Sequence, residues 1–281
     1  MQASLKLVRN VSQILPKRFC SASSSKLINL TVDDKSGYAT MELNRPPVNS
    51  LNLELLQSIS EGLDQLNENR TRGLILTSTS DKVFCAGLDI MEMYKPDLER
   101  AGNFWRTLQD VWLKLYGSSF PTAAAINGHS PAGGCLLSLC CEYRVMLNNF
   151  TIGLNETRLG IIAPTWFQAS MLNVLSRRET ELALTLGKMF TTDEAFKKGL
   201  VDECANSKDE AIQKCVGFLD QFRKISPEAR SITKQALRAN DIKALDENRD
   251  QDVQLFLFTI QQKKVQKGLE MYLESLKKKS S

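Results

Sequence analysis

The sequence predicts an α/β domain built in layers, and three observations support this prediction. Short apolar segments with strand character alternate with amphipathic segments of helical spacing over much of the 281 residues. Glycine-containing loops follow two buried-type strands, at residues 73–77 and 122–127. After residue 204 only helical segments remain. We therefore expect a core at residues 26–205 and a helical C-terminal region at residues 206–281.

The first half of the core is expected to open with a hairpin and continue into helices. Asn49 or Ser50 is a candidate cap for the first helix, because both side chains can accept a hydrogen bond from a helix N-terminus. The aromatic and apolar residues after residue 98 recur on one helical face, which is typical of a core-facing helix. The predicted elements are strands at residues 27–32, 38–43 and 73–77 and helices at residues 53–66 and 98–116.

The second half is expected to contain further strands, then helices alone. An apolar helix should begin near Gly133, directly after the strand and its Gly-Pro loop. A C-terminal region of few helices with apolar faces usually packs on the main domain or on a sister subunit, because it is too small to bury those faces by itself. The predicted elements are strands at residues 122–127, 143–147, 151–154 and 201–204 and helices at residues 193–198, 209–222, 227–239 and 246–276.

The basic excess of the chain lies in its first residues. The formal charge is +4, four basic residues precede Cys20, and no acidic residue occurs before Asp33. Without those four, the chain is neutral. A basic, Ser-rich, acid-free leader has the composition of a mitochondrial transit peptide. We therefore predict a transit peptide at residues 1–25 and a mitochondrial matrix location, with a disordered basic tail as the alternative. A neutral mature chain also argues against a nucleic-acid partner.

Composition disfavours several other classes of function. The seven cysteines form no C-x-x-C pair and the chain has a single histidine, His129, which argues against a zinc site and against a Cys-His or Ser-His catalytic pair. His129 is expected to be a loop residue satisfied by backbone. No apolar run approaches the ~18 residues of a membrane span. We predict no metal, no separate cofactor and no membrane span.

Three windows carry candidate chemistry. The loop before Gly133 leads into a helix N-terminus, where unpaired N–H groups can hold a negative oxygen. A second glycine loop, V-F-C-A-G-L-D-I, spans residues 83–90. Glu156 lies between apolar neighbours, where desolvation would raise the pKa of its carboxyl towards that of a working base. Taken singly, each window is also compatible with an ordinary turn or a salt-bridged surface glutamate.

Together, the three windows suit an acyl thioester whose carbonyl must become an enolate. The α-proton of such a thioester is only weakly acidic, so the reaction needs donors aimed at the developing oxyanion and a base beside it.

Three segments resemble the enoyl-CoA hydratase/isomerase (crotonase) superfamily, and the resemblance runs from about residue 27 to the C-terminus. They are F-C-A-G-L-D-I at residues 84–90, A-I-N-G-H-S-P-A-G-G-C at residues 125–135 and I-G-L-N-E-T-R-L-G-I-I-A-P at residues 152–164. The last two are most similar to the isomerase branch. The resemblance implies a spiral of repeated ββα units, a helical C-terminal region that mediates homotrimers, and an acyl-CoA substrate.

The resemblance also implies roles for individual residues. The backbone N–H groups of Leu88 and Gly133 would form the oxyanion hole, and Glu156 would be the catalytic carboxylate. Asn155 would border the acyl chain. The loop that would wrap the adenine and pantetheine portions of CoA consists of Ala86, Gly87, Leu88, Asp89 and Ile90.

One departure from the family pattern indicates the reaction. Hydratases of this family carry a second glutamate three residues beyond the oxyanion glycine, and that position is Leu136 here. A single base suits isomerisation of 3-cis- or 3-trans-enoyl-CoA to 2-trans-enoyl-CoA, in the β-oxidation of unsaturated fatty acids. The alternatives are another acyl-CoA reaction, such as hydration or thioester hydrolysis, and a noncatalytic acyl-CoA- or RNA-binding member.

The sequence leaves the ends of the substrate unassigned. Arg45 and Lys82 are candidates for holding the CoA phosphates. The preferred acyl-chain length depends on how a set of large side chains is arranged, and the candidates are Met91, Met93, Trp105, Leu136, Phe150 and Trp166.

Overall fold

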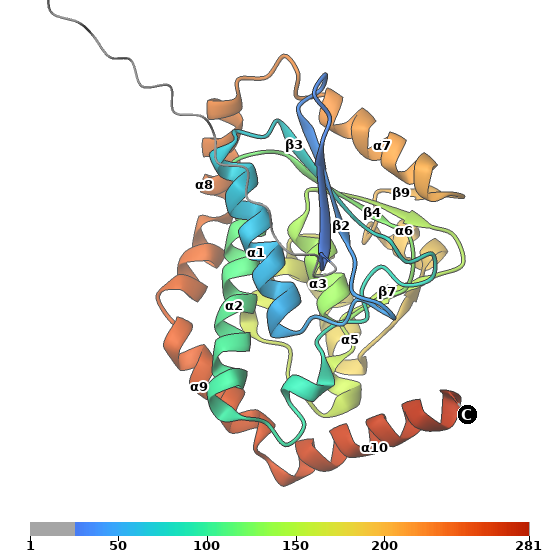
Figure 1. The fold of residues 1–281 in the computed structure, drawn as a ribbon, viewed down its shortest axis with the longest axis vertical. Helices are drawn as coiled ribbons and strands as arrows, with labels where there is room; N and C mark the ends of the chain where they lie inside the picture. The colour runs from blue at the N-terminus through green and yellow to red at the C-terminus, as the bar shows by residue number, and fades with distance from the viewer. Residues whose placement is uncertain (1–25, 281) are drawn as a thin grey trace, which may run out of the picture.

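The structure is a computed structural model that describes residues 26–280 (Figure 1). The predicted transit peptide at residues 1–25 lies outside the described residues. The strands are β1 (Ile28–Val32), β2 (Tyr38–Leu43), β3 (Gly73–Ser78), β4 (Thr122–Ile126), β5 (Ser130–Pro131), β6 (Tyr143–Leu147), β7 (Thr151–Gly153), β8 (Phe190–Thr191) and β9 (Glu203–Ala205). The helices are α1 (Leu53–Glu68), α2 (Leu98–Tyr116), α3 (Gly133–Cys140), α4 (Thr165–Leu172), α5 (Arg177–Leu186), α6 (Thr192–Lys198), α7 (Lys208–Asp220), α8 (Pro227–Asp246), α9 (Arg249–Ile260) and α10 (Lys263–Ser280), with short 3-10 turns η1 (Ile90–Glu92) and η2 (Glu156–Leu159).

A mostly parallel sheet forms the centre of the domain, in the order β1-β2-β3-β4-β6-β9. Within this sheet, as far as the structure describes it, only the β1–β2 pair is antiparallel, as the predicted hairpin requires. Along β4, Ala123 and Ala125 face the cluster that includes residues of α7, whereas Ala124 and Ile126 face the main core. This alternation follows from the two-residue period of a strand. In Figure 1 the sheet accordingly lies between α7 on one side and α1, α2 and α3 on the other.

A second, smaller sheet of β5, β7 and β8 holds the segments that follow β4 and β6. β5 pairs with β7 in parallel, with Ser130 opposite Ile152 and Pro131 opposite Gly153. The loop before α3 is therefore joined by backbone hydrogen bonds to the segment that leads into Glu156.

Two local predictions need correction. Asn52 caps α1 by accepting a hydrogen bond from the Leu55 N–H, so neither Asn49 nor Ser50 is the cap. The helix itself begins at Leu53, as predicted, and only the capping residue differs. Asn49 instead turns its side-chain amide into the core, where it donates to the Ser78 hydroxyl and to the Phe84 carbonyl.

The predicted long helix at residues 246–276 is wrong, because the chain forms α9 and α10 with a break after Ile260. Gln266 accounts for the turn: its side-chain amide donates to the Met93 and Ile260 carbonyls and accepts from the Lys95 N–H. These tertiary hydrogen bonds draw α10 across the end of η1. The structure also extends the helix predicted at residues 227–239 to Asp246 and adds α4, α5 and β8, which were not predicted.

Candidate active site

Two glycine loops meet beyond the carboxyl ends of β3 and β4. The loop after β3 is held to the loop after β4 by a parallel bridge between Val83 and His129, and the Phe84 N–H donates to the His129 carbonyl at 3.0 Å. Gly87 has a positive φ of 89°, and a Cβ placed there would lie 3.2 Å from the Gly133 nitrogen. Only glycine tolerates this conformation and this contact together. The predicted juxtaposition of the two loops is therefore present.

The backbone around Leu88 leaves one N–H available. Ala86 donates to the Val48 carbonyl, Gly87 to the Cys85 sulfur and Asp89 to the Leu51 carbonyl. Within residues 26–280, no hydrogen bond engages the Leu88 N–H. Because its neighbours on both sides are fixed, this free donor has a set direction.

The second set of free donors is the N-terminus of α3. Ala132 occupies the position before the helix with φ 48° and provides no side-chain cap. The Gly133 N–H has no intrahelical partner, as expected for a first helical residue. A Cβ on Gly133 would lie 3.3 Å from Leu88 Cδ2, which places the two predicted oxyanion residues side by side. Helix α3 also brings its positive dipole end to this point.

Glu156 faces inward at the start of η2. The residue is 7% exposed, and neither carboxylate oxygen has a hydrogen-bond partner within the described residues. Burial raises the pKa of Glu156 from 4.5 to about 7. Its backbone is tied to the oxyanion loop, because the Ala132 N–H donates to the Gly153 carbonyl at 2.8 Å.

The surroundings of Glu156 are apolar or weakly polar. Leu136, at the position of the second hydratase glutamate, is 1% exposed and belongs to the main core. Burial raises the pKa of the Cys135 thiol well above its usual value, and the negative charge of Glu156 adds to the shift. That coupling places the first turn of α3 within electrostatic range of the carboxylate. By contrast Glu92, also buried, is paired with Arg100 at 2.7 Å.

The remaining predicted binding residues lie around this centre. Asn155 immediately precedes η2 and is partly exposed, as are Ala86 and Ile90. The Asp89 carboxylate has a structural task, because it accepts from the Met91 N–H and pairs with Arg45 at 2.9 Å.

The Arg45–Asp89 ion pair was not predicted from the sequence, in which Arg45 is only a candidate for holding the CoA phosphates. A second Arg45 nitrogen donates to the Ser50 carbonyl, so the guanidinium clamps the loop of Leu88 to the segment before α1. The sequence feature that could have indicated this ion pair is an N-R-P segment, which contains Arg45, upstream of a G-L-D segment, which contains Asp89. Lys82 is exposed.

His129 has the role expected of a loop histidine. Its Nδ1 accepts from the Thr151 backbone N–H at 3.2 Å and lies 3.0 Å from the Thr151 hydroxyl. The ring also packs edge-on against Phe150. Within residues 26–280, no group of three or more His, Cys, Asp or Glu side chains has an arrangement suited to a metal ion. The same residues contain no helix long and apolar enough to cross a membrane.

This combination of fold and site defines a class of protein. The chain belongs to the enoyl-CoA hydratase/isomerase family, whose model matches residues 33–280, and the resemblance seen in the sequence is thereby confirmed. Among its relatives are the proteins named enoyl-CoA delta isomerase 1, mitochondrial. The mouse protein is 42% identical over 259 residues, which are 91% of this chain and 89% of the relative. The human protein is 41% identical over 257 residues, which are 90% and 84% of the two chains.

A solved structure gives the same relationship. The crystal structure of human mitochondrial delta3-delta2-enoyl-CoA isomerase superimposes with a TM-score of 0.88 at 39% sequence identity, covering 91% of this chain and all of that one. The crotonase fold predicted from the three motifs is confirmed.

Proposed function

We propose that this chain isomerises 3-cis- and 3-trans-enoyl-CoA to 2-trans-enoyl-CoA in the β-oxidation of unsaturated fatty acids. The observation that carries the proposal is the single buried carboxylate of Glu156, unpartnered and with its pKa raised to about 7. The similarity to delta isomerases over about nine tenths of the chain supports the same reaction.

The reaction moves one proton and one double bond. The thioester oxygen binds between the N–H groups of Leu88 and Gly133, and the Glu156 carboxylate removes a proton from C2. The electron pair of that C–H bond shifts toward the carbonyl, which gives a dienolate whose negative oxygen the two N–H groups stabilise. Glu156 then returns the proton to C4, leaving the double bond between C2 and C3 in conjugation with the thioester.

The environment of Glu156 suits a base that must also act as an acid. A carboxyl with a pKa near the working pH can accept and release a proton at comparable cost. With Leu136 in place of a second carboxylate, no acidic side chain at that position orients a water molecule. This disfavours hydration, which needs a positioned water, and we do not adopt the hydratase, thioesterase or noncatalytic RNA-binding alternatives.

The rest of the functional setting belongs to the same proposal. The loop from Ala86 to Ile90 wraps the adenine and pantetheine portions of the acyl-CoA, and Asn155 borders the acyl chain. No cofactor beyond the CoA of the substrate is needed, because the reaction is redox-neutral within one molecule. Relatives named mitochondrial support a mitochondrial location, which we narrow to the matrix, and the helical C-terminal region supports a homotrimer.

The direct test compares the wild type with Glu156→Gln on 3-cis-enoyl-CoA, 3-trans-enoyl-CoA and 2-trans-enoyl-CoA. We expect the wild type to form the 2-trans product from the first two and to leave the third unhydrated, and the variant to lose isomerisation. Gly133→Pro removes one oxyanion donor and should lower kcat by roughly 10²–10³. A side chain at this position would also lie 2.9 Å from Leu51 Cδ1, so thermal melting of the variant checks that the fold is retained. Near-normal isomerisation by Glu156→Gln would overturn the proposal.

A further inference from the structure

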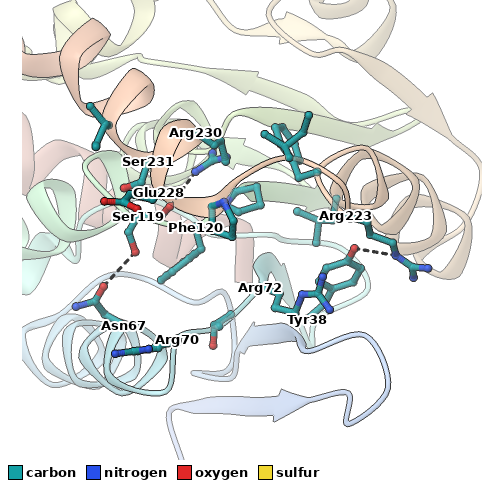
Figure 2. Close-up of a pocket in the computed structure, with 17 residues that line it drawn as sticks. Tyr38, Asn67, Arg70, Arg72, Ser119, Phe120, Arg223, Glu228, Arg230 and Ser231 are labelled. Atoms are coloured by element: carbon teal, nitrogen blue, oxygen red, sulfur yellow. Dashed lines mark hydrogen bonds between the residues drawn. The ribbon is translucent and has the colours of Figure 1, made fainter.

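A cavity of about 640 Å³ lies away from the proposed active site (Figure 2). Its lining comes from the start of β2, the segments before β3 and β4, and the connection between α7 and α8. A cavity of this size holds a drug-sized molecule. Neither the sequence analysis nor the isomerase mechanism gives it a role.

The cavity and the catalytic centre lie at opposite ends of the parallel strands of the large sheet. Tyr38, Arg72 and Pro121 mark the amino ends of parallel strands β2, β3 and β4, whereas the oxyanion loops follow the carboxyl ends of β3 and β4. The six residues of β3 span about 20 Å at roughly 3.3 Å per residue. A molecule in the cavity is therefore separated from Glu156 by the length of a strand.

The rim of the cavity is cationic although the mature chain is neutral. Four arginines and the carboxylate of Glu228 line it. Arg223 is paired with Asp220, and Arg230 with Glu142, so the uncompensated positive charge comes from Arg70 and Arg72. Arg70 and Arg72 are exposed, and neither guanidinium forms a hydrogen bond or ion pair with any residue between 26 and 280. The stem of Arg72 packs over Gly37, where a Cβ would meet it at 2.9 Å, so the side chain is supported at its base.

One wall of the cavity adds a buried cation. Arg230 has a side chain only 8% exposed; it pairs with Glu142 and donates to the Ser119 carbonyl, but its buried Nε has no partner. Glu142 also holds the buried Lys234, so two cations share one carboxylate. Figure 2 shows Arg230 beside Ser119, while Arg72 lies beside Tyr38.

The floor of the cavity is apolar. Phe120 and Leu219 are buried, and Phe222 presents a ring whose face is stacked by the Arg230 guanidinium at 5.1 Å. A cationic rim over an apolar floor suits a ligand with an anionic end and a flat or apolar body. Two unpaired arginines match a phosphate better than a single carboxylate, because the guanidinium fork binds phosphate oxygens in pairs.

We propose that this cavity binds a small organic phosphate of the nucleotide class, with its phosphates at the cationic rim to which Arg70 and Arg72 contribute and its ring against the apolar floor that includes Phe120. The inference concerns the opposite ends of the strands from the proposed isomerase site. Because the CoA of an acyl-CoA also carries an ADP group, the two sites are distinguished by whether replacing Arg70 and Arg72 weakens ADP binding, and not by ADP binding alone.

The test uses ADP as the probe and isothermal titration of the full mature chain. We expect saturable ADP binding that Arg70→Gln combined with Arg72→Gln weakens by about tenfold or more, because both replaced groups are charge-assisted donors. The matched control, Lys35→Gln with Lys224→Gln, removes two exposed positive charges from neighbouring surface outside the lining and should leave binding unchanged.

Two companion measurements make the result decisive. Thermal melting should be the same for both double variants, since none of the four side chains has a hydrogen bond or ion pair to lose. Adenosine should bind much more weakly than ADP. The proposal is overturned if ADP fails to bind at millimolar concentration, if adenosine binds as well as ADP, or if both double variants bind ADP as the wild type does.

Discussion

The buried carboxylate of Glu156 should destabilise the folded protein at alkaline pH. In the unfolded chain this carboxyl ionises near pH 4.5, whereas in the fold burial raises its pKa to about 7. The raised pKa gives a stability contribution that is fully present below pH 4.5 and is lost as the pH rises through about 7. A difference of about 2.5 pKa units corresponds to roughly 3 kcal/mol. Glu156→Gln keeps the shape and removes the charge, so it should raise the free energy of unfolding by about 3 kcal/mol at pH 8 and by no more than about 1 kcal/mol at pH 5.

Urea denaturation of both proteins at pH 5 and pH 8 measures this difference. Glu92 provides a matched control, because it is equally buried but is held by Arg100 and by the Leu53 N–H. Glu92→Gln should destabilise the protein at pH 8, since it removes one charge from a satisfied pair. Equal stabilities of wild type and Glu156→Gln at both pH values would refute the claim that desolvation governs this carboxyl.

Three other predictions concern residues of the active site, the first with a control position on α7. Gly134→Ala should destabilise the protein by about 3 kcal/mol, because the new Cβ would collide with the Cys85 carbonyl oxygen. Gly217→Ala is the control: it lies in open space on α7 and should stabilise the protein by about 0.5–1 kcal/mol. Chemical denaturation of both variants measures the two changes in the free energy of unfolding. Leu136→Glu should raise the rate of hydration of 2-trans-enoyl-CoA by roughly tenfold or more and lower the rate of isomerisation, whereas Leu136→Gln should not raise hydration. Equal hydration by the two variants would contradict the claim that the lack of a second carboxylate prevents hydration. The wild-type isomerisation rate should rise by about tenfold per pH unit below pH 7 and level off above it, and a flat profile in a stopped assay would contradict a base with this pKa.

Backbone pairing, and not side-chain contact, sets the positions of the Glu156 carboxylate and of the Leu88 and Gly133 N–H groups relative to one another. The β5–β7 pairing fixes the segment before Gly133 against the segment before Glu156, and the bridge at Val83 fixes the loop of Leu88. The apolar packing around these connections excludes water from the carboxylate. We infer that substitutions in this backbone frame will cost more activity than those of the exposed CoA-facing side chains.

Local patterns were sufficient for the elements whose sequence and packing agree. Residues 98–116 were predicted as a helix and form α2 with the same bounds, because their apolar positions fall on one face and Asp97 caps the start. The C-terminal break was not predictable, because residues 249–276 have good helical character throughout and the turn depends on Gln266 contacting the distant Met93. Helix α5 had a usable signal in Ser176 with Glu179 three residues later, although only the cap hydrogen bond established it.

The sequence alone determined the order of the main strands and helices up to residue 154, the presence of two glycine loops and one glutamate in an apolar segment, and, through the motifs, the family. Only the tertiary structure decided that the Leu88 N–H is unengaged within the described residues, that both oxygens of Glu156 are buried without a partner, and that arginines from α8 and from the connections before β3 and after α7 gather around one cavity. The physical reason is that burial and hydrogen-bond satisfaction are properties of neighbours distant along the chain. Residue type and local spacing fix what a side chain can do, whereas its surroundings in the fold fix its charge and its available partners.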